Sequence, residues 1–375
     1  MKRLLIALLG VCPIVLLAQS GADFQKEFAT QPGKKLDVNL RTGGAITIVG
    51  WEKDMVAYKG YREGRDGDDC VLEAEQTASG VSIESHYASS HRDRSGGVRL
   101  EVNVPSKYDV HIETMGGAVS IESVEGSFSG RTMGGALELT KLKGNLDLLT
   151  MGGPVTLKNS DVDGKVKTMG GQVLLDEVTG DVSASSMGGK VIQKHVTRRS
   201  GETKGTEVNI SSMGGDIDVD DAPLGADVQT MGGAIRINSA GKFVKAKTMG
   251  GKIRIEAVDG WVDATTMGGD VHVAMTGDPS QGKRSVSLKS MSGNIELSVP
   301  EGLSMDIDVE LTYTKGHEGD YSITSDFPLH QEVSPQWESG NGSPRKTITA
   351  TAQVSGGKNP VHIKTINGNV TIKKI

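Results

Sequence analysis

Acidic side chains gather at two places in this sequence where they could bind a cation or act on a glycan. Asp216, Asp218 and Asp220 alternate along one segment, with Asp221 beside them, so the first three share one face of a strand. A second group lies in the loop Asp66-Gly67-Asp68-Asp69. Calcium sites usually add a bidentate glutamate, and glycan-cleaving enzymes need carboxylates that converge on a groove. We therefore expect solvated surface clusters, with weak cation binding as the alternative, and no enzyme.

Thioether groups form a second candidate, because ten methionines recur along the chain. They are Met115, Met133, Met151, Met169, Met187, Met213, Met231, Met249, Met267 and Met291. Thioethers suit Cu(I), but copper sites normally combine them with His or Cys. Only the scattered His111, His195 and His272 lie near the methionines. We therefore expect a column of adaptable packing side chains, with no metal and no cofactor.

The spacing of these methionines defines a structural repeat. Nine begin the tripeptide Met-Gly-Gly and the last begins Met-Ser-Gly. They recur at one constant interval, as from Met133 to Met151, except where the insertions 194–206 and 276–284 lengthen two of the gaps. A fixed short period predicts a solenoid, in which each unit stacks on its neighbour.

Within each unit, aliphatic residues alternate twice, as in Val155/Leu157 and Leu146/Leu148. Period two predicts strands with one buried face. Each unit then reads as strand, corner, strand and Met-Gly-Gly corner. The sequence predicts an all-β fold: a single-stranded parallel β-solenoid of about ten 18-residue, two-strand rungs, with β-rich capping segments at both ends.

The Met-Gly-Gly corner has a predicted backbone role. A tight reversal favours glycine because glycine adopts positive φ freely, and we expect this in pairs such as Gly152-Gly153. The Thr or Ser before each methionine falls on the same side of the two-residue period as the buried positions and so points inward. Its hydroxyl is therefore expected to form a hydrogen bond with the corner backbone. The structural corner is represented by Met115, Gly116, Gly117, Met133, Gly134, Gly135, Met151, Gly152, Gly153, Met231, Gly232 and Gly233.

Several residues depart from the repeat pattern and mark a candidate partner surface. Gln193 occupies an apolar position just before the first insertion, where we expect it to bond the backbone of the inserted residues. On the outward face, the apolar residues Leu174 and Ile192 lie side by side. On the same face, Asp218 lies one rung from Arg236. The candidate surface comprises Leu174, Ile192, Asp216, Asp218, Asp220 and Arg236, together with the insertions 194–206 and 276–284.

The N-terminus predicts export. Lys2-Arg3, an apolar run and Ser20-Gly21-Ala22 are typical of a signal peptide cut after Ala22. If Cys12 leaves with it, Cys70 is the only thiol, so no intrachain disulfide can form. The formal charge is −6 and becomes −8 without Lys2 and Arg3, which argues against nucleic-acid binding. No later segment is apolar enough to cross a membrane.

The organisation of the chain predicts four parts. They are a signal peptide at 1–22, an N-terminal β cap at 23–110, the solenoid of Met-Gly-Gly repeats at 111–298 and a C-terminal β cap at 299–375. Open ends of a parallel array would template aggregation, so both terminal parts are expected to act as caps.

Four short stretches resemble one known family. They are Leu36-Asp37-Val38-Asn39-Leu40-Arg41-Thr42-Gly43-Gly44-Ala45-Ile46-Thr47-Ile48, Leu100-Glu101-Val102-Asn103-Val104-Pro105, Ile295-Glu296-Leu297-Ser298-Val299-Pro300-Glu301-Gly302 and Thr365-Ile366-Asn367-Gly368-Asn369-Val370-Thr371-Ile372. With the repeats between them, the chain resembles the bacterial "putative adhesin" family of β-strand repeat proteins, a domain of unknown function. The resemblance implies an exported cell-envelope protein with a binding or structural role and no agreed catalytic residues. The regular Met-Gly-Gly corner departs from the family's usual pattern.

We interpret the sequence as that of an exported, non-enzymatic scaffold of a bacterial envelope, periplasmic or at the cell surface. It would bind an envelope or extracellular protein or glycan through its outward face and insertions, since loops carry recognition on repeat scaffolds. The alternatives are an envelope-stress sensor that binds a regulatory ligand, or a glycan-acting enzyme on a parallel β-helix. The identity of the partner, the oligomeric state and the handedness of the coil are not indicated by the sequence.

Overall fold

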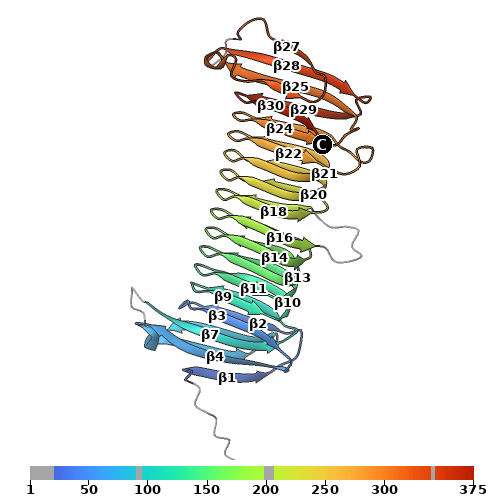
Figure 1. Ribbon diagram of the computed structural model, residues 1–375. Coiled ribbons are helices and arrows are strands. Elements are labelled where there is room, and N and C mark those ends of the chain that lie inside the picture. The colour runs from blue at the N-terminus through green and yellow to red at the C-terminus, as the bar shows by residue number, and fades with distance from the viewer. Residues whose placement is uncertain (1–20, 90–94, 198–206, 339–342) are drawn as a thin grey trace, which may run out of the picture.

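The structure is a computed structural model and describes residues 21–89, 95–197, 207–338 and 343–375. Within these residues the chain is an elongated rod of stacked strands with two short 3₁₀ turns and no α-helix (Figure 1). The predicted all-β class is confirmed. Residues 1–20 of the predicted signal peptide at 1–22 and residues 198–206 of the insertion 194–206 lie outside the described residues. No described helix is long and apolar enough to cross a membrane.

Strands β8 to β24 form the repeat array. Before the first insertion these are β8 (Asp109–Thr114), β9 (Val119–Glu122), β10 (Glu125–Thr132), β11 (Leu137–Thr140), β12 (Lys143–Thr150), β13 (Val155–Thr168), β14 (Val173–Thr179), β15 (Val182–Ser186) and β16 (Val191–Thr197). After it they are β17 (Val208–Ser212), β18 (Ile217–Ala222), β19 (Ala226–Gln229), β20 (Ile235–Lys247), β21 (Ile253–Thr266), β22 (Val271–Met275), β23 (Val286–Ser290) and β24 (Ile295–Val299).

Each array strand pairs in parallel with its copy in the next unit. Leu137 of β11 pairs with Val155 of β13, its counterpart one repeat later. The register continues across both insertions, through Val191–Ile217 and Val262–Val286. Met133 and Met151 therefore belong to neighbouring rungs, as predicted, and the Met151 N–H donates to the Thr132 carbonyl at 3.0 Å.

The core lies between the two stacks of strands. Side chains alternate between buried and exposed, and the aliphatic columns supply the buried set, as with Val155, Leu157, Ile235 and Ile237. Each aliphatic side chain stacks on its counterpart in the next rung. A single rung on its own would expose its apolar side chains to water on both flanks. This apolar surface is therefore removed from water only when rungs stack on one another.

The N-terminal end adds strands from outside the repeats. They are β1 (Phe24–Ala29), β2 (Lys35–Leu40), β3 (Ile46–Trp51), β4 (Met55–Gly64), η1 (Gly67–Asp69), β5 (Cys70–Gln76), β6 (Gly80–Tyr87) and β7 (Gly96–Pro105). Strands β2 and β3 pair in parallel with β8 and β9 and so build one more rung. Beyond that rung β4 runs antiparallel to β7, β1 to β4 and β5 to β6. The complete sheet is therefore mixed rather than wholly parallel.

The C-terminal end is built in a similar way. Its elements are β25 (Met305–Thr314), η2 (Lys315–His317), β26 (Ile323–Ser325), β27 (His330–Val333), β28 (Arg345–Val354), β29 (Asn359–Ile366) and β30 (Val370–Lys374). The last two strands return to the array and pair in parallel with β23 and β24. The intervening β25 and β28 form an antiparallel pair that covers β29. In Figure 1 the chain consequently ends beside the array and not at the tip of the rod.

Candidate functional site

The Met-Gly-Gly corners stack into one continuous edge of the rod, held by a ladder of buried hydroxyls. The Thr150 hydroxyl donates to the Gly135 carbonyl of the preceding rung at 2.7 Å and accepts the Gly153 N–H of its own rung at 3.3 Å. Donor bonds of this kind link neighbouring rungs from Thr132 to Ser290. The prediction of inward hydroxyls that bond corner backbone is confirmed.

The predicted reason for the two glycines is wrong. Gly152, Gly153, Gly232 and Gly233 are all outside the positive-φ region, and among the Met-Gly-Gly glycines only Gly117 adopts it, at 93°. The requirement is steric instead. A Cβ atom on Gly153 would lie 2.2 Å from the carbonyl oxygen of Gly135 in the preceding rung. The second glycine is thus needed because adjacent corners approach too closely for a side chain.

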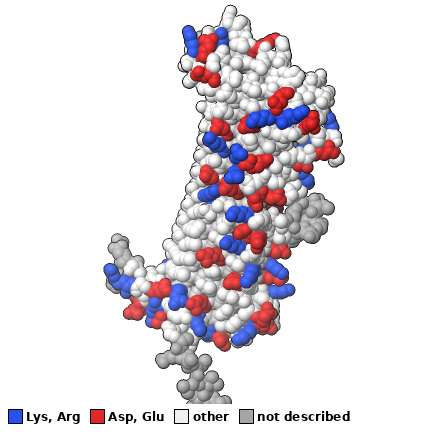
Figure 2. Space-filling view, in the orientation of Figure 1, with Lys and Arg blue, Asp and Glu red and all other residues white. Residues whose placement is uncertain are grey.

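The methionine side chains stand outside the core along this edge. Nine of the ten are 40–64 % exposed, and Met151 is half-buried. Beside them the first glycines carry no side chain, and a Cβ atom on Gly134 would meet nothing within 4 Å. We call this strip, made of the ten repeat methionines and the glycines that follow them, the methionine edge. It bears no charge, and Figure 2 shows an uncharged margin along the array.

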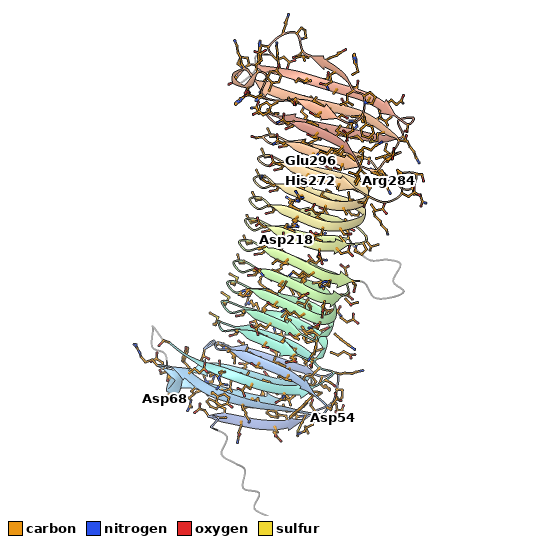
Figure 3. The ribbon with its side chains drawn as sticks, viewed as in Figure 1. Asp54, Asp68, Asp218, His272, Arg284 and Glu296 are labelled. Atoms are coloured by element: carbon orange, nitrogen blue, oxygen red, sulfur yellow. The ribbon has the colours of Figure 1, made fainter. Side chains whose placement is uncertain are left out.

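The charged side chains lie instead on the outward strand faces, where opposite signs are interleaved (Figure 2). His272 Nδ1 lies 3.3 Å from a Glu296 carboxylate oxygen (Figure 3). Lys373 Nζ lies 2.5 Å from the other carboxylate oxygen of Glu296. The hydrogen bond from Lys373, with the one from His272, lowers the pKa of Glu296. In the same way the hydrogen bond from Arg254 lowers the pKa of Glu256. The Glu296 contacts connect neighbouring rungs at the surface, whereas the Arg254–Glu256 pair lies within the single strand β21.

The predicted partner surface is brought together in part. Leu174 and Ile192 pair directly in register and are half-buried, and Ile192 pairs next with Asp218. Asp218 and Arg236 are also register partners, as predicted from their spacing, but each forms its ion pair with another residue. Asp218 lies 2.5 Å from Lys190, whereas Arg236 lies 3.8 Å from Glu256.

The acidic group holds structural partners rather than an open site. Asp216 accepts the Ala234 N–H of the next rung at 2.7 Å, and Asp220 accepts the Asn238 amide at 2.9 Å. In the N-terminal loop, Asp66 accepts the Ser95 N–H at 2.8 Å. Among the described residues no three His, Cys, Asp or Glu side chains converge as metal ligands would.

The second insertion is organised by a buried arginine that the repeat pattern did not single out. Arg284 is 2 % exposed, and its guanidinium donates to the Gln281 and Thr276 carbonyls at 2.9 and 2.6 Å. It also forms an ion pair with Asp259 of β21. Figure 3 shows it where the loop leaves the array. A basic pair, Lys283-Arg284, inside an inserted segment gives no sequence signal for this role.

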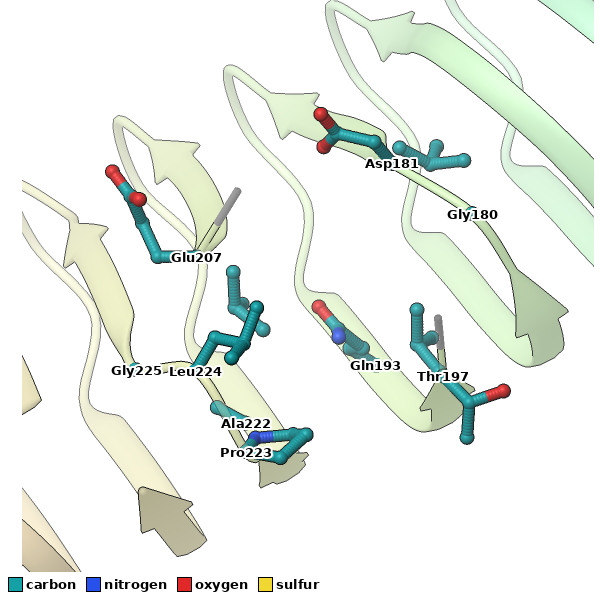
Figure 4. Close-up of a pocket in the computed structure, with 12 residues that line it drawn as sticks. Gly180, Asp181, Gln193, Thr197, Glu207, Ala222, Pro223, Leu224 and Gly225 are labelled. Carbon is teal, nitrogen blue, oxygen red and sulfur yellow. The ribbon is translucent and has the colours of Figure 1, made fainter. Parts of the chain in front are cut away.

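A cavity of about 50 Å³ opens at the corner opposite the methionine edge (Figure 4). Its walls come from the corners Gly180–Val182 and Ala222–Gly225 and from residues on either side of the first insertion. Gln193 is 4 % exposed and lines this cavity. Its carboxamide forms no hydrogen bond within the described part of the chain, and the bond expected to the inserted residues would involve residues outside that part.

Three solved protein structures are similar to this chain at low sequence identity. A "putative cell adhesion protein" from Clostridium sporogenes shares 8 % identity and a TM-score of 0.19, over 94 % of this chain and 99 % of that one. A "putative adhesin" from Bacteroides fragilis shares 15 % identity and a TM-score of 0.30, over 64 % and 96 %. A "putative lipid binding protein" from Parabacteroides distasonis shares 12 % identity and a TM-score of 0.27, over 73 % and 96 %. No curated protein sequence matches the chain.

The family comparison covers most of the sequence. The profile of one family, described as Toastrack DUF4097, matches residues 94–373, which agrees with the resemblance seen in the sequence. The match spans the whole array together with the C-terminal strands up to β30. This chain therefore belongs to the Toastrack DUF4097 family.

Proposed function

We propose that this protein is an exported, non-enzymatic scaffold of the bacterial cell envelope, and that it acts by assembling along its methionine edge. The N-terminal signal supports export, and the rod supplies a rigid support. In this proposal residues 111–298 are the solenoid of about ten 18-residue rungs, and the segments 23–110 and 299–375 cap it.

The single observation that carries the proposal is the exposure of the methionine edge. Nine repeat methionines are 40–64 % exposed along one line that also includes the half-buried Met151, whereas Met275 and Met305 are completely buried in the core. Contiguous exposed apolar surface usually marks an interaction site. Methionine suits such a site because its flexible, polarizable side chain adapts to its partner.

The partner that fits this edge best is a second copy of the chain. The methionines repeat at the strand spacing of about 4.8 Å, along a line of roughly 45 Å. A partner can place a side chain against every rung only if it carries the same spacing over the same length. A second rod has that spacing, whereas an α-helix repeats at about 5.4 Å per turn and would drift out of step.

The acidic residues support a non-enzymatic role. Glycan cleavage needs one carboxylate held as an acid and a second placed across the scissile bond. Asp216 and Asp220 accept hydrogen bonds from the next rung, and Asp218 pairs with Lys190. These carboxylates connect neighbouring strands of the array.

Sedimentation equilibrium of the mature protein tests the proposal. We expect reversible, concentration-dependent self-association that is lost when Met133, Met169 and Met231 are changed to Gln. A matched variant with Thr140, Thr156 and Thr265 changed to Gln alters the outward faces and should associate like the wild type. A wild type that stays monomeric, or an edge variant that still associates, would show that the edge does not join copies of this chain.

Export is tested separately. The protein expressed with its predicted signal peptide should be recovered outside the cytoplasm with Asp23 as its N-terminal residue, measured by intact mass. Recovery of the uncut chain in the cytoplasm would contradict this part of the proposal.

A further inference from the structure

The methionine edge concentrates the accessible sulfur atoms of the described chain in one strip. Nine of its ten methionines are 40–64 % exposed. Outside the repeats, Met275 and Met305 are completely buried and Met55 is half-buried. Cys70, the one cysteine of the described residues, is also completely buried. A small oxidant in solution therefore meets the thioethers of the edge before it meets any other sulfur group described here.

Each corner fixes the methionine backbone and leaves the thioether outside the fold. The Met133 and Met169 N–H groups donate to the Thr114 and Thr150 carbonyls of the preceding rung, each at 3.1 Å. The first glycine adds no side chain beside the thioether, and a Cβ atom on Gly134 would meet nothing within 4 Å. A chemical change at the sulfur atom would therefore leave the rung ladder and the core intact.

A thioether at such a position can be oxidised by a hydroperoxide without a cofactor. A lone pair on the sulfur attacks the terminal peroxide oxygen, so that an S–O bond forms and the O–O bond breaks. The sulfur loses two electrons, and the hydroxyl proton of the peroxide passes to the departing oxygen, which leaves as an alcohol or as water. The product is methionine sulfoxide, a polar group that methionine sulfoxide reductases convert back to the thioether.

Oxidation would change the whole edge because a methionine stands on every rung. Each sulfoxide places a strong acceptor on an uncharged strip (Figure 2), repeated at about 4.8 Å. A second rod offers few donors for these oxygens, since corner N–H groups already bond to the hydroxyl ladder, as at Gly134 and Gly135. A polar group buried without a partner weakens association by a factor of about ten or more.

We propose that the methionine edge is a reversible oxidation site, at which hydroperoxides convert the thioethers to sulfoxides and thereby separate associated rods. The separation rests on the proposed function, whereas the selective oxidation of the edge does not. Association is reversible in that proposal, so the oxidant reaches the sulfur atoms of separated copies. The sulfoxides then keep those copies apart until they are reduced.

Peptide mapping by mass spectrometry tests the oxidation site. The mature protein is treated briefly with hydrogen peroxide at a concentration where its copies are separated. The exposed repeat methionines should react at least about tenfold faster than Met275 and Met305, because the core excludes the oxidant. Far-UV circular dichroism should stay unchanged, and in urea all methionines should react at similar rates. Equal rates in the folded protein, or loss of β structure when only the edge is oxidised, would overturn the site.

Sedimentation equilibrium tests the separation of the rods. Peroxide-treated protein should associate at least about a hundredfold more weakly than untreated protein, because several sulfoxides would be buried together. Treatment with methionine sulfoxide reductases should restore association, with peptide mapping to measure the repair. Oxidised protein that associates as strongly as the untreated protein, or repaired protein that stays separated, would overturn the inference.

Two sets of variants assign the effect to the edge. Changing all ten repeat methionines to Leu keeps the strip apolar but removes the sulfur, so this variant should associate both before and after peroxide treatment. The matched control carries Met275→Leu and Met305→Leu, a swap that cores tolerate, and should separate on oxidation as the wild type does. If peroxide still separated the variant without edge sulfur, the inference would be wrong.

These measurements distinguish failure of the inference from failure of the proposed function. A wild type that is monomeric before treatment contradicts the proposed function, and the oxidation site is then decided by peptide mapping. A wild type that associates, and that continues to do so after its edge is oxidised, contradicts the inference and leaves the proposed function in place.

Discussion

A Cβ atom on Gly135 would lie 1.8 Å from the carbonyl oxygen of Gly117 in the preceding rung, whereas one on Gly134 would meet nothing within 4 Å. Two adjacent glycines of one corner therefore have different constraints. The obstacle at Gly135 is backbone held on both sides by the rung ladder, so it cannot move aside. We expect Gly135→Ala to lower the free energy of unfolding by at least about 3 kcal/mol.

Gly134→Ala is the matched control, one residue away. It should change stability by no more than about 1 kcal/mol and can be stabilising, because alanine restricts the unfolded chain. Urea denaturation followed by far-UV circular dichroism measures both variants. Similar losses in the two would mean that the steric contact is not the constraint, and that the tripeptide serves whatever binds the corner.

The repeat was predictable from the sequence because it depends on local period, but the role of its glycines was not. The alternation of apolar residues at Val155 and Leu157 indicates a strand with one buried face, and this signal does not depend on where the strand lies in the fold. The approach of Gly135 to Gly117 depends on how two rungs stack, and positive φ was the local explanation for a glycine pair. Positive φ occurs at the opposite corner instead, both at non-glycine residues such as Lys141 and Asn159, with φ of 54° and 49°, and at glycines such as Gly144, with φ of 121°.

The ends of the rod and the cavity beside Gln193 needed long-range information. Strand β2 stacks on β8 although Leu36 and its partner Val110 are far apart in the sequence, and no repeat marks that pairing. Gln193 was recognisable as an exception to its column. The cavity beside it, however, is lined by residues of neighbouring rungs, whose stacking the sequence pattern does not specify.

The hydroxyl ladder gives a second prediction. Thr150→Val keeps the shape of the side chain but removes the donor to Gly135 and the acceptor for Gly153. Two buried backbone groups then lose a partner, which should cost about 1–3 kcal/mol. Thr150→Ser should retain most of the stability, since serine occupies the same column at Ser186.

Thr156→Val is the control for this loss, because Thr156 lies on the outward face. Its effect should stay within about 0.5 kcal/mol. The same denaturation experiment compares the three variants. If Thr150→Val were as stable as Thr156→Val, water or a rearranged corner would be replacing the hydroxyl.

Arg284 provides a third prediction, about the second insertion. Arg284→Met keeps much of the side-chain length but leaves the Gln281 and Thr276 carbonyls without their donor. We expect faster amide hydrogen exchange throughout 276–284, with the array strands little affected. Arg254→Met, on the exposed face, is the control and should leave exchange in this loop at the wild-type rate. Unchanged protection in Arg284→Met would show that the loop is held by other contacts.

Acid stability gives the last prediction, through Glu296. Hydrogen bonds from Lys373 and His272 lower the pKa of this carboxyl in the folded protein. A lowered folded-state pKa means that the ionised form stabilises the fold. Its contribution is present above the unfolded value of about 4.3 and is lost as the pH falls through the folded value. Tm should therefore fall between about pH 5 and pH 3 less steeply in Glu296→Gln than in the wild type.

Glu138→Gln, at an exposed position of β11 whose register partner is Thr156, serves as the control and should follow the wild-type profile. Parallel profiles for Glu296→Gln and the wild type would mean that this ion pair contributes nothing to acid unfolding.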